Sequence, residues 1–163
     1  MNGAPSWLLA KRASGSAKLR EGKIVMLAST LRVLVVDDSD IVRRAICKIL
    51  QAQHDIEIVC EASNGRDAIR FAKEHEPDLV LMDISMPIVS GFEATRLIKH
   101  ALPHIKVIFL TQHRSHSFMK EALAAGAHGF VTKDNATREL IAEVRRVQTV
   151  QPKPLSEEDS ASA

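Results

Sequence analysis

Short apolar runs of strand length recur along the chain, and stretches with helical spacing separate them. The runs occupy residues 31–36, 56–60, 78–83 and 106–110, with a shorter run around 130–131. In the third run, Val80, Leu81 and Met82 are apolar without alternation, which is typical of a strand buried on both faces of a parallel sheet. The pattern predicts five strands.

The segments between these runs show the 3.6-residue period of amphipathic helices. After Ser39, a candidate helix cap, one predicted buried stripe comprises Ile41, Val42, Ala45, Ile46, Ile49 and Leu50. Weaker stripes follow at 68–72, 92–98 and 115–125. A fifth predicted helix, after the last strand, has one apolar face of Leu140, Ile141, Val144 and Val147. Strands and helices that alternate with short connections predict an α/β fold with a doubly wound parallel sheet, joined by right-handed crossovers.

Composition divides the 163 residues into one domain and two tails. Residues 1–30 have no sustained period and carry a net charge of +4, so they are expected to form a flexible basic tail. Residues 31–150 form the predicted domain, and 151–163 are expected to form a flexible acidic tail. Met26 could be the natural start of the protein. The net charge of +2 argues against a protein built mainly to coat nucleic acid or membrane.

Cys47 and Cys60 lie in different predicted elements and have no metal-ligand spacing. Reduced thiols in a cytoplasmic protein are therefore expected. No apolar run approaches the roughly 18 residues of a membrane span, so no membrane partner is predicted.

Polar residues follow the predicted strands at their carboxyl ends, where open α/β sheets bind ligands. Asp37 and Asp38 follow the first strand, Asp83 the third, Thr111 the fourth and Lys133 the fifth. If the first and third strands are neighbours, three carboxylates crowd one small site, and their repulsion calls for a cation. Oxygen ligands open to water suit Mg²⁺.

A fixed ammonium, a hydroxyl and a metal together match the oxygens of a phosphoryl group in transfer. Asp83 is then the candidate nucleophile that becomes an aspartyl-phosphate. Each residue alone also has an ordinary explanation: Asp38 could be a helix cap, and Lys133 a surface lysine. The order and spacing of the whole set favour the chemical interpretation.

The segments that contain these polar residues resemble the receiver domain of two-component response regulators. The resemblance covers about residues 31–150 and rests on Val35-Val36-Asp37-Asp38-Ser39, Leu81-Met82-Asp83-Ile84-Ser85-Met86-Pro87 with Gly91, Thr111, and Gly129-Phe130-Val131-Thr132-Lys133. Within that CheY-like family, residues 121–133 are most similar to the NarL/FixJ branch. The resemblance implies a three-layer, flavodoxin-like fold with strand order 2-1-3-4-5.

The resemblance also implies a role for each matched residue. Asp83 would accept a phosphoryl group from a histidine kinase or phosphotransfer protein, and Lys133 would pair with it. Asp37, Asp38, Asp83 and the backbone carbonyl of Ser85 would hold Mg²⁺. Thr111 would move toward the phosphate, and Phe130 would then swing inward and remodel the surface that binds partners.

Two positions depart from the family pattern, and two others lie where its members vary. Asp134 follows Lys133 where many relatives have proline, and a cis bond there would cost about 3 kcal/mol, so the geometry of this loop is left open. Gln112 follows Thr111 where many relatives have a small residue. Ser85 and His113 occupy positions where relatives vary and where the lifetime of the phosphoryl group is set. His113 and His116 are expected to be surface residues in preference to metal ligands.

Two further functions compete with a phosphorylation switch. A Mg²⁺-dependent aspartyl-phosphate phosphohydrolase commonly has an acid–base carboxylate two residues after its nucleophile, where this chain has Ser85. A degenerate receiver that only dimerises is opposed by the intact acidic and basic residues. Members of the NarL/FixJ branch usually carry a DNA-binding domain after the receiver, and the residues after 150 are too few to form one. We therefore expect a stand-alone receiver without direct DNA binding in preference to a fragment of a transcription regulator. The kinase, the target and homodimerisation are left open.

Overall fold

A central sheet of parallel strands organises the domain. The computed structural model describes residues 18–20, 23–25, 30–112 and 116–149. Its sheet comprises β3 (Leu31–Val36), β4 (Ile56–Ala62), β5 (Leu79–Asp83), β6 (Lys106–Thr111) and β7 (Gly129–Thr132). The five strands have the order β4-β3-β5-β6-β7, and all their pairings are parallel. This order confirms the predicted 2-1-3-4-5 arrangement, with β3 beside β5.

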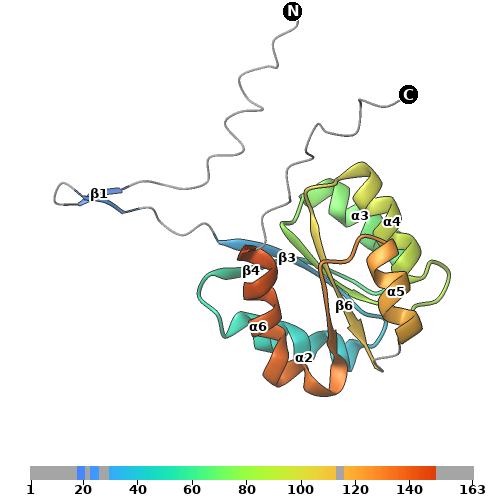
Figure 1. Cartoon of the computed structure of the whole chain (residues 1–163). Helices are drawn as coiled ribbons and strands as arrows, with labels where there is room; N and C mark the ends of the chain where they lie inside the picture. The colour runs from blue at the N-terminus through green and yellow to red at the C-terminus, as the bar shows by residue number, and fades with distance from the viewer. Residues whose placement is uncertain (1–17, 21–22, 26–29, 113–115, 150–163) are drawn as a thin grey trace, which may run out of the picture.

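Helices cover both faces of this sheet. They are α2 (Asp40–Gln51), α3 (Gly65–His75), α4 (Gly91–Ala101), α5 (His116–Ala124) and α6 (Ala136–Thr149). Figure 1 shows α3, α4 and α5 together on one side of the sheet and α2 and α6 on the other. The predicted three-layer α/β/α architecture is therefore confirmed.

The core consists of two apolar layers, one on each face of the sheet. Alternate strand residues point to opposite faces, so Val33 and Val35 of β3 pack toward α2 and α6, while Leu34 and Val36 pack toward α3 and α4. All four are fully buried. Burial on both faces explains why the strands are continuous apolar runs and do not alternate with polar residues.

Side-chain caps begin the three helices that follow β3, β4 and β5. Ser39, Asn64 and Ser90 each accept a hydrogen bond from a backbone N–H three residues later, at 3.5, 2.9 and 3.2 Å. Such caps satisfy N–H groups that the first helical turn leaves unpaired. The connections from β3, β4 and β5 to their helices are fixed in this way at the carboxyl edge of the sheet.

The predicted buried stripe of α2 was partly wrong. Ile41 is 83% exposed and Ala45 is exposed, whereas Cys47, which the prediction omitted, is buried with Ile46 and Leu50. Neither Ile41 nor Ala45 is among the residues of the α2–α6 core layer. The helix therefore contacts the sheet along a face that includes Val42, Ile46 and Leu50 and leaves out Ile41 and Ala45.

The remaining observations concern the two predicted tails, the peptide bonds and the length of the helices. Two short strands, β1 (Lys18–Arg20) and β2 (Lys23–Val25), pair antiparallel within the segment predicted as a flexible tail. Residues 1–17, 21–22 and 26–29 of that segment, and residues 151–163, lie outside the described residues, so both tails stay predictions. All peptide bonds of the described residues are trans, that between Lys133 and Asp134 included, and a 3₁₀ turn, η1 (Lys133–Asn135), begins there. None of the described helices is long and apolar enough to cross a membrane.

Candidate phosphoryl-acceptor site

The polar residues predicted to share a site converge at the carboxyl edge of the sheet. Asp37 follows β3, Asp83 is the last residue of β5, Thr111 is the last of β6 and Lys133 follows β7. Because β3 and β5 are neighbours, their terminal carboxylates lie side by side. The condition on which the predicted metal site depended is therefore met.

Lys133 joins two of these carboxylates. Its Nζ lies 2.7 Å from Asp37 Oδ2 and 3.0 Å from Asp83 Oδ1. The exposed fraction is 0% for Asp37 and 3% for Asp83, so these ion pairs lie in the interior, where solvent screens them little. The turn of η1 directly after β7 brings the long lysine side chain back across the end of the sheet.

Burial and charge perturb both partners of this ion pair. Burial raises the pKa of Asp83; the hydrogen bond and charge of Lys133 oppose that rise, and the charge of Asp37 adds to it. Burial alone would lower the pKa of Lys133, but the two carboxylates outweigh it, so this pKa is raised. The ammonium is therefore held charged between two acidic groups.

The donor set fits a hard divalent cation. Carboxylate oxygens of Asp37, Asp38 and Asp83 all lie within 4.8 Å of one another. Asp37 Oδ2 is buried, and the Lys133 ammonium 2.7 Å away is the one charged partner that the described residues give it. Three carboxylates face one ammonium, so the site has excess negative charge. Oxygen-only sites of this kind suit Mg²⁺.

Hydrogen bonds fix both the carboxylate and the backbone carbonyl of Asp37. Its Oδ1 accepts a hydrogen bond from Ser39 N–H at 2.9 Å. The Asp37 carbonyl accepts another from Arg43 Nη1 at 2.8 Å, and Arg43 also pairs with Asp40 and with Glu61. The amino end of α2 is thus attached to the acidic site, while Asp38 stays exposed to solvent.

Two backbone contacts of Gly91 bring the β5–α4 loop against this site. An added Cβ at Gly91 would lie 2.0 Å from the carbonyl oxygen of Asp83, so only glycine permits this approach. Gly91 N–H donates to the carbonyl of Ile84 at 3.0 Å. Ser85 lies in this loop, and its backbone hydrogen bond lowers the pKa of Asp83 against the effect of burial. Its predicted role as a carbonyl ligand stays a prediction.

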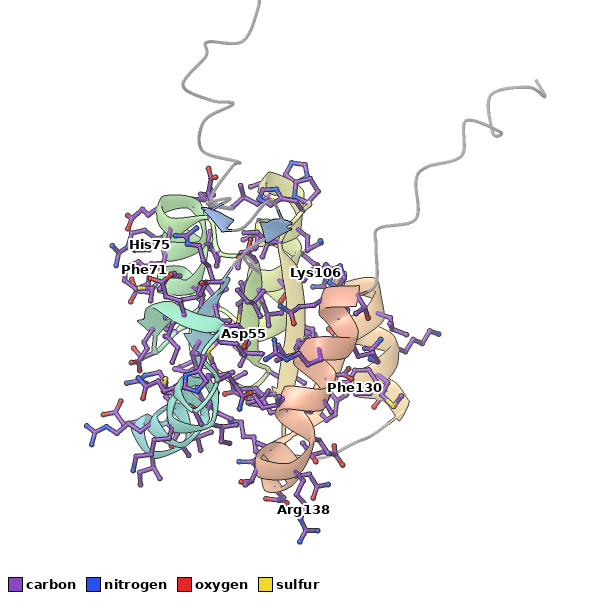
Figure 2. All side chains as sticks on the ribbon, turned by 90° about the vertical axis from the view of Figure 1, so that its left-hand side faces the viewer. Asp55, Phe71, His75, Lys106, Phe130 and Arg138 are labelled. Atoms are coloured by element: carbon purple, nitrogen blue, oxygen red, sulfur yellow. The ribbon has the colours of Figure 1, made fainter. Side chains whose placement is uncertain are left out.

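Thr111 and Phe130 occupy adjacent strands beyond the acidic residues. Thr111 is 8% exposed, and Phe130 is half-buried and pairs in register with Phe109. Figure 2 shows Phe130 beside α6, at the side of the sheet away from Phe71 and His75 of α3. Phe130 also lines an open hollow of about 330 Å³, together with Arg138 and other residues of α6.

The remaining predicted positions add little to the site. Gln112 is exposed after β6. His113 and the side chain of His116, considered as metal ligands, lie outside the described residues. In α5, Ala122 is buried while Phe118 and Leu123 are 40% and 64% exposed, so its apolar stripe serves both for packing and as surface.

Thr132 is a buried polar residue near the site that was not predicted to belong to it. Thr132 is 8% exposed, and its Oγ1 has no hydrogen-bond partner. Its place directly before Lys133 was visible in the sequence, but its alignment with Thr111 depends on the register between β6 and β7.

Known proteins with related sequences were found by comparison. A family model of the response regulator receiver domain matches residues 33–145. The chain is 39% identical over 119 residues to the transcriptional regulatory protein LnrK of Bacillus subtilis, which covers 73% of this chain and 54% of that protein. It is 39% identical over 121 residues to the response regulator UvrY of Escherichia coli K12, covering 74% and 56%. The chain spans little more than half the length of these relatives.

Solved structures show the same fold. The response regulator domain of Thermotoga maritima CheB superposes with a TM-score of 0.71 at 34% identity, over 76% of this chain and 99% of that one. The signal receiver domain of the putative response regulator NarL from Mycobacterium tuberculosis gives a TM-score of 0.70 at 27% identity, over 75% and 99%. Together with the convergent acidic residues and Lys133, these matches show that the chain belongs to the response regulator receiver domain family, in its NarL/FixJ branch.

Proposed function

We propose that this chain is a phosphorylation-controlled switch in which Asp83 accepts a phosphoryl group from a histidine kinase or a phosphotransfer protein. The observation that carries the proposal is the Lys133 ammonium held between Asp37 and Asp83 at a site of three carboxylates. An isolated structural ion pair balances its charges, whereas here three carboxylates face one ammonium and the site keeps excess negative charge.

In the transfer step an Asp83 carboxylate oxygen attacks phosphorus, a new O–P bond forms, and the bond from phosphorus to the donor breaks. Lys133 then turns from one carboxylate partner to the developing acyl phosphate and offsets its charge. Asp37, Asp38 and Asp83, with the Ser85 carbonyl, would hold Mg²⁺, which supplies positive charge to the phosphoryl oxygens when bound. Thr111 would donate its hydroxyl to one phosphoryl oxygen.

The readout would be a packing change at the edge of the sheet. Movement of Thr111 toward the phosphoryl group would vacate space beside β7, and Phe130 belongs to that strand and lines the hollow against α6. A rotamer change of Phe130 would alter the surface formed by α5, β7 and α6, where Phe118 and Leu123 are exposed. Partners that distinguish the two forms would bind there.

Phosphorylation by a small donor tests the proposal. The protein is incubated with Mg²⁺ and acetyl phosphate and then weighed intact. Wild type should gain one phosphoryl group, and Asp83→Asn should gain none. Asp134→Asn, which removes an exposed carboxylate outside the metal cluster, is the matched control and should behave as wild type.

Other outcomes would favour the competing functions. Rapid and continuous release of phosphate at saturating donor would indicate a phosphohydrolase, against which Ser85 at the second position after Asp83 already argues. No mass change in wild type with Mg²⁺ would contradict the proposed switch and favour a degenerate module.

A further inference from the structure

Thr132 is a buried hydroxyl with no partner beside the proposed phosphoryl site. It ends β7 directly before Lys133, is 8% exposed, and its Oγ1 forms no hydrogen bond. Buried polar groups without partners are rare because each loses its bonds to water without replacement. Such a group at the edge of a reaction site suggests a partner that arrives during the functional cycle.

Strand register places this hydroxyl next to Thr111. Thr111 and Thr132 are paired residues of adjacent parallel strands, whose axes are about 4.8 Å apart. Paired residues of a parallel ladder point to the same face. Two residues earlier, Phe109 and Phe130 are also paired, and both belong to the core layer beneath α4 and α5. The side chains of Thr111 and Thr132 therefore start from the same face, one strand apart.

We propose that Thr132 is a positioning residue for Thr111 in the phosphorylated form, an inference that rests on the proposed function. When Thr111 donates its hydroxyl hydrogen to a phosphoryl oxygen, its Oγ1 still has lone pairs that can accept. The Thr132 hydroxyl, on the neighbouring strand, donates to that oxygen. The two bonds then run in one direction, from Thr132 to Thr111 to the phosphoryl group, and each polarises the next.

Thr95 provides a matched comparison within the same chain. It lies in α4, is fully buried, and its Oγ1 likewise has no hydrogen-bond partner. It differs from Thr132 in having no place at the carboxyl end of a strand. Thr95→Val thus removes an equally buried hydroxyl without touching the proposed relay.

The test measures the affinity of the Mg²⁺-loaded protein for beryllofluoride, a non-covalent mimic of the acyl phosphate, by titration calorimetry. Thr132→Val should weaken binding about fivefold to tenfold, the value of one ordinary hydrogen bond. Thr132→Ala, which needs no extra space, should do the same. Thr132→Ser should bind as wild type, and Thr95→Val should stay within about twofold of it.

A double-mutant cycle separates positioning from simple packing. In a Thr111→Val background, Thr132→Val should cause no further loss, because the bond it removes has no acceptor. An equal loss in both backgrounds, or unchanged affinity in Thr132→Val, overturns the inference. Thermal unfolding should show Thr132→Val at least as stable as wild type, because valine suits a strand and removes an unpaired hydroxyl.

Failure of the underlying function gives a different result. Wild type that neither binds beryllofluoride nor gains a phosphoryl group at Asp83 overturns the proposed function, and this inference with it. Wild type that does both, combined with no effect of Thr132→Val, overturns only the role of Thr132.

Discussion

Gly91 lies against the backbone of Asp83 so closely that a Cβ would stand 2.0 Å from the Asp83 carbonyl oxygen. The contact joins the first turn of α4 to the last residue of β5. It holds the intervening loop, with Ser85, at the mouth of the acidic site. Glycine at position 91 therefore has a steric reason in this chain.

Gly91→Ala should destabilise the domain by about 1–3 kcal/mol, because the obstructing atoms are backbone and cannot move aside cheaply. It should also slow phosphoryl uptake from acetyl phosphate, since the loop that carries Ser85 must shift. Chemical denaturation and intact mass measure the two effects. Gly129→Ala is the control: its closest obstructions are the side-chain ends of Glu143 and Arg146, so its loss of stability should be smaller. Equal losses would contradict the steric argument.

Magnesium should raise the free energy of unfolding in wild type by about 1.4 kcal/mol at a concentration ten times its Kd. Asp38→Asn should remove most of that gain while changing the stability of the magnesium-free protein by less than about 0.5 kcal/mol, because Asp38 is exposed. Thermal unfolding with and without Mg²⁺ measures both numbers. Asp134→Asn should keep the full gain. A magnesium gain that survives Asp38→Asn would remove this carboxylate from the metal site.

His128 should make stability depend on pH between about 6.5 and 4. Burial, assisted by the charges of Lys99, Lys106 and Arg146, lowers the pKa of His128 to about 4, and its Nδ1 accepts a hydrogen bond from Val107 N–H at 3.2 Å. The unfolded chain takes up the proton at higher pH than the folded one. The contribution of the neutral His128 ring to the free energy of unfolding is therefore complete above about pH 6.5 and is lost as the pH falls toward 4.

His128→Asn should abolish this pH dependence, because an amide oxygen can accept the same hydrogen bond and does not titrate. Chemical denaturation at a series of pH values gives the slope of the unfolding free energy against pH, and in this range the slope should correspond to one proton fewer than in wild type. Between pH 6.5 and 4, the loss of unfolding free energy should be about 1–2 kcal/mol smaller in His128→Asn than in wild type, once solvent screening of the half-exposed ring is allowed for. His104→Asn, at an exposed position, should retain the slope that His128 supplies. An unchanged slope in His128→Asn would mean that the ring is protonated in the folded protein.

Ile46→Ala should cost about 2–5 kcal/mol of stability, because Ile46 is 1% exposed in the core between α2 and the sheet. Ile41→Ala should change it by less than about 0.5 kcal/mol, since Ile41 is 83% exposed. Urea denaturation distinguishes the two. A large loss for Ile41→Ala would mean that the first turn of α2 is covered in solution.

The difference between these two isoleucines shows the limit of periodicity. Residues 41 and 46 both fit an apolar stripe, but only packing against β3 and α6 selects the face of α2 that is buried. The strands were easier to predict, because a strand covered on both faces is apolar at every position. Leu31–Val36 agrees with its predicted bounds, and β4 extends two residues beyond the predicted 56–60.

The sequence by itself determined the strand–helix alternation, the apolar strands and the polar residue at the end of each central strand, because these depend on local composition and spacing. Only the tertiary structure decided that Lys133 contacts both Asp37 and Asp83, that Gly91 touches the backbone of Asp83, and that Thr132 lies in register with Thr111. Those relationships depend on strand order and register, which join residues tens of positions apart. Spacing along the chain does not contain that information.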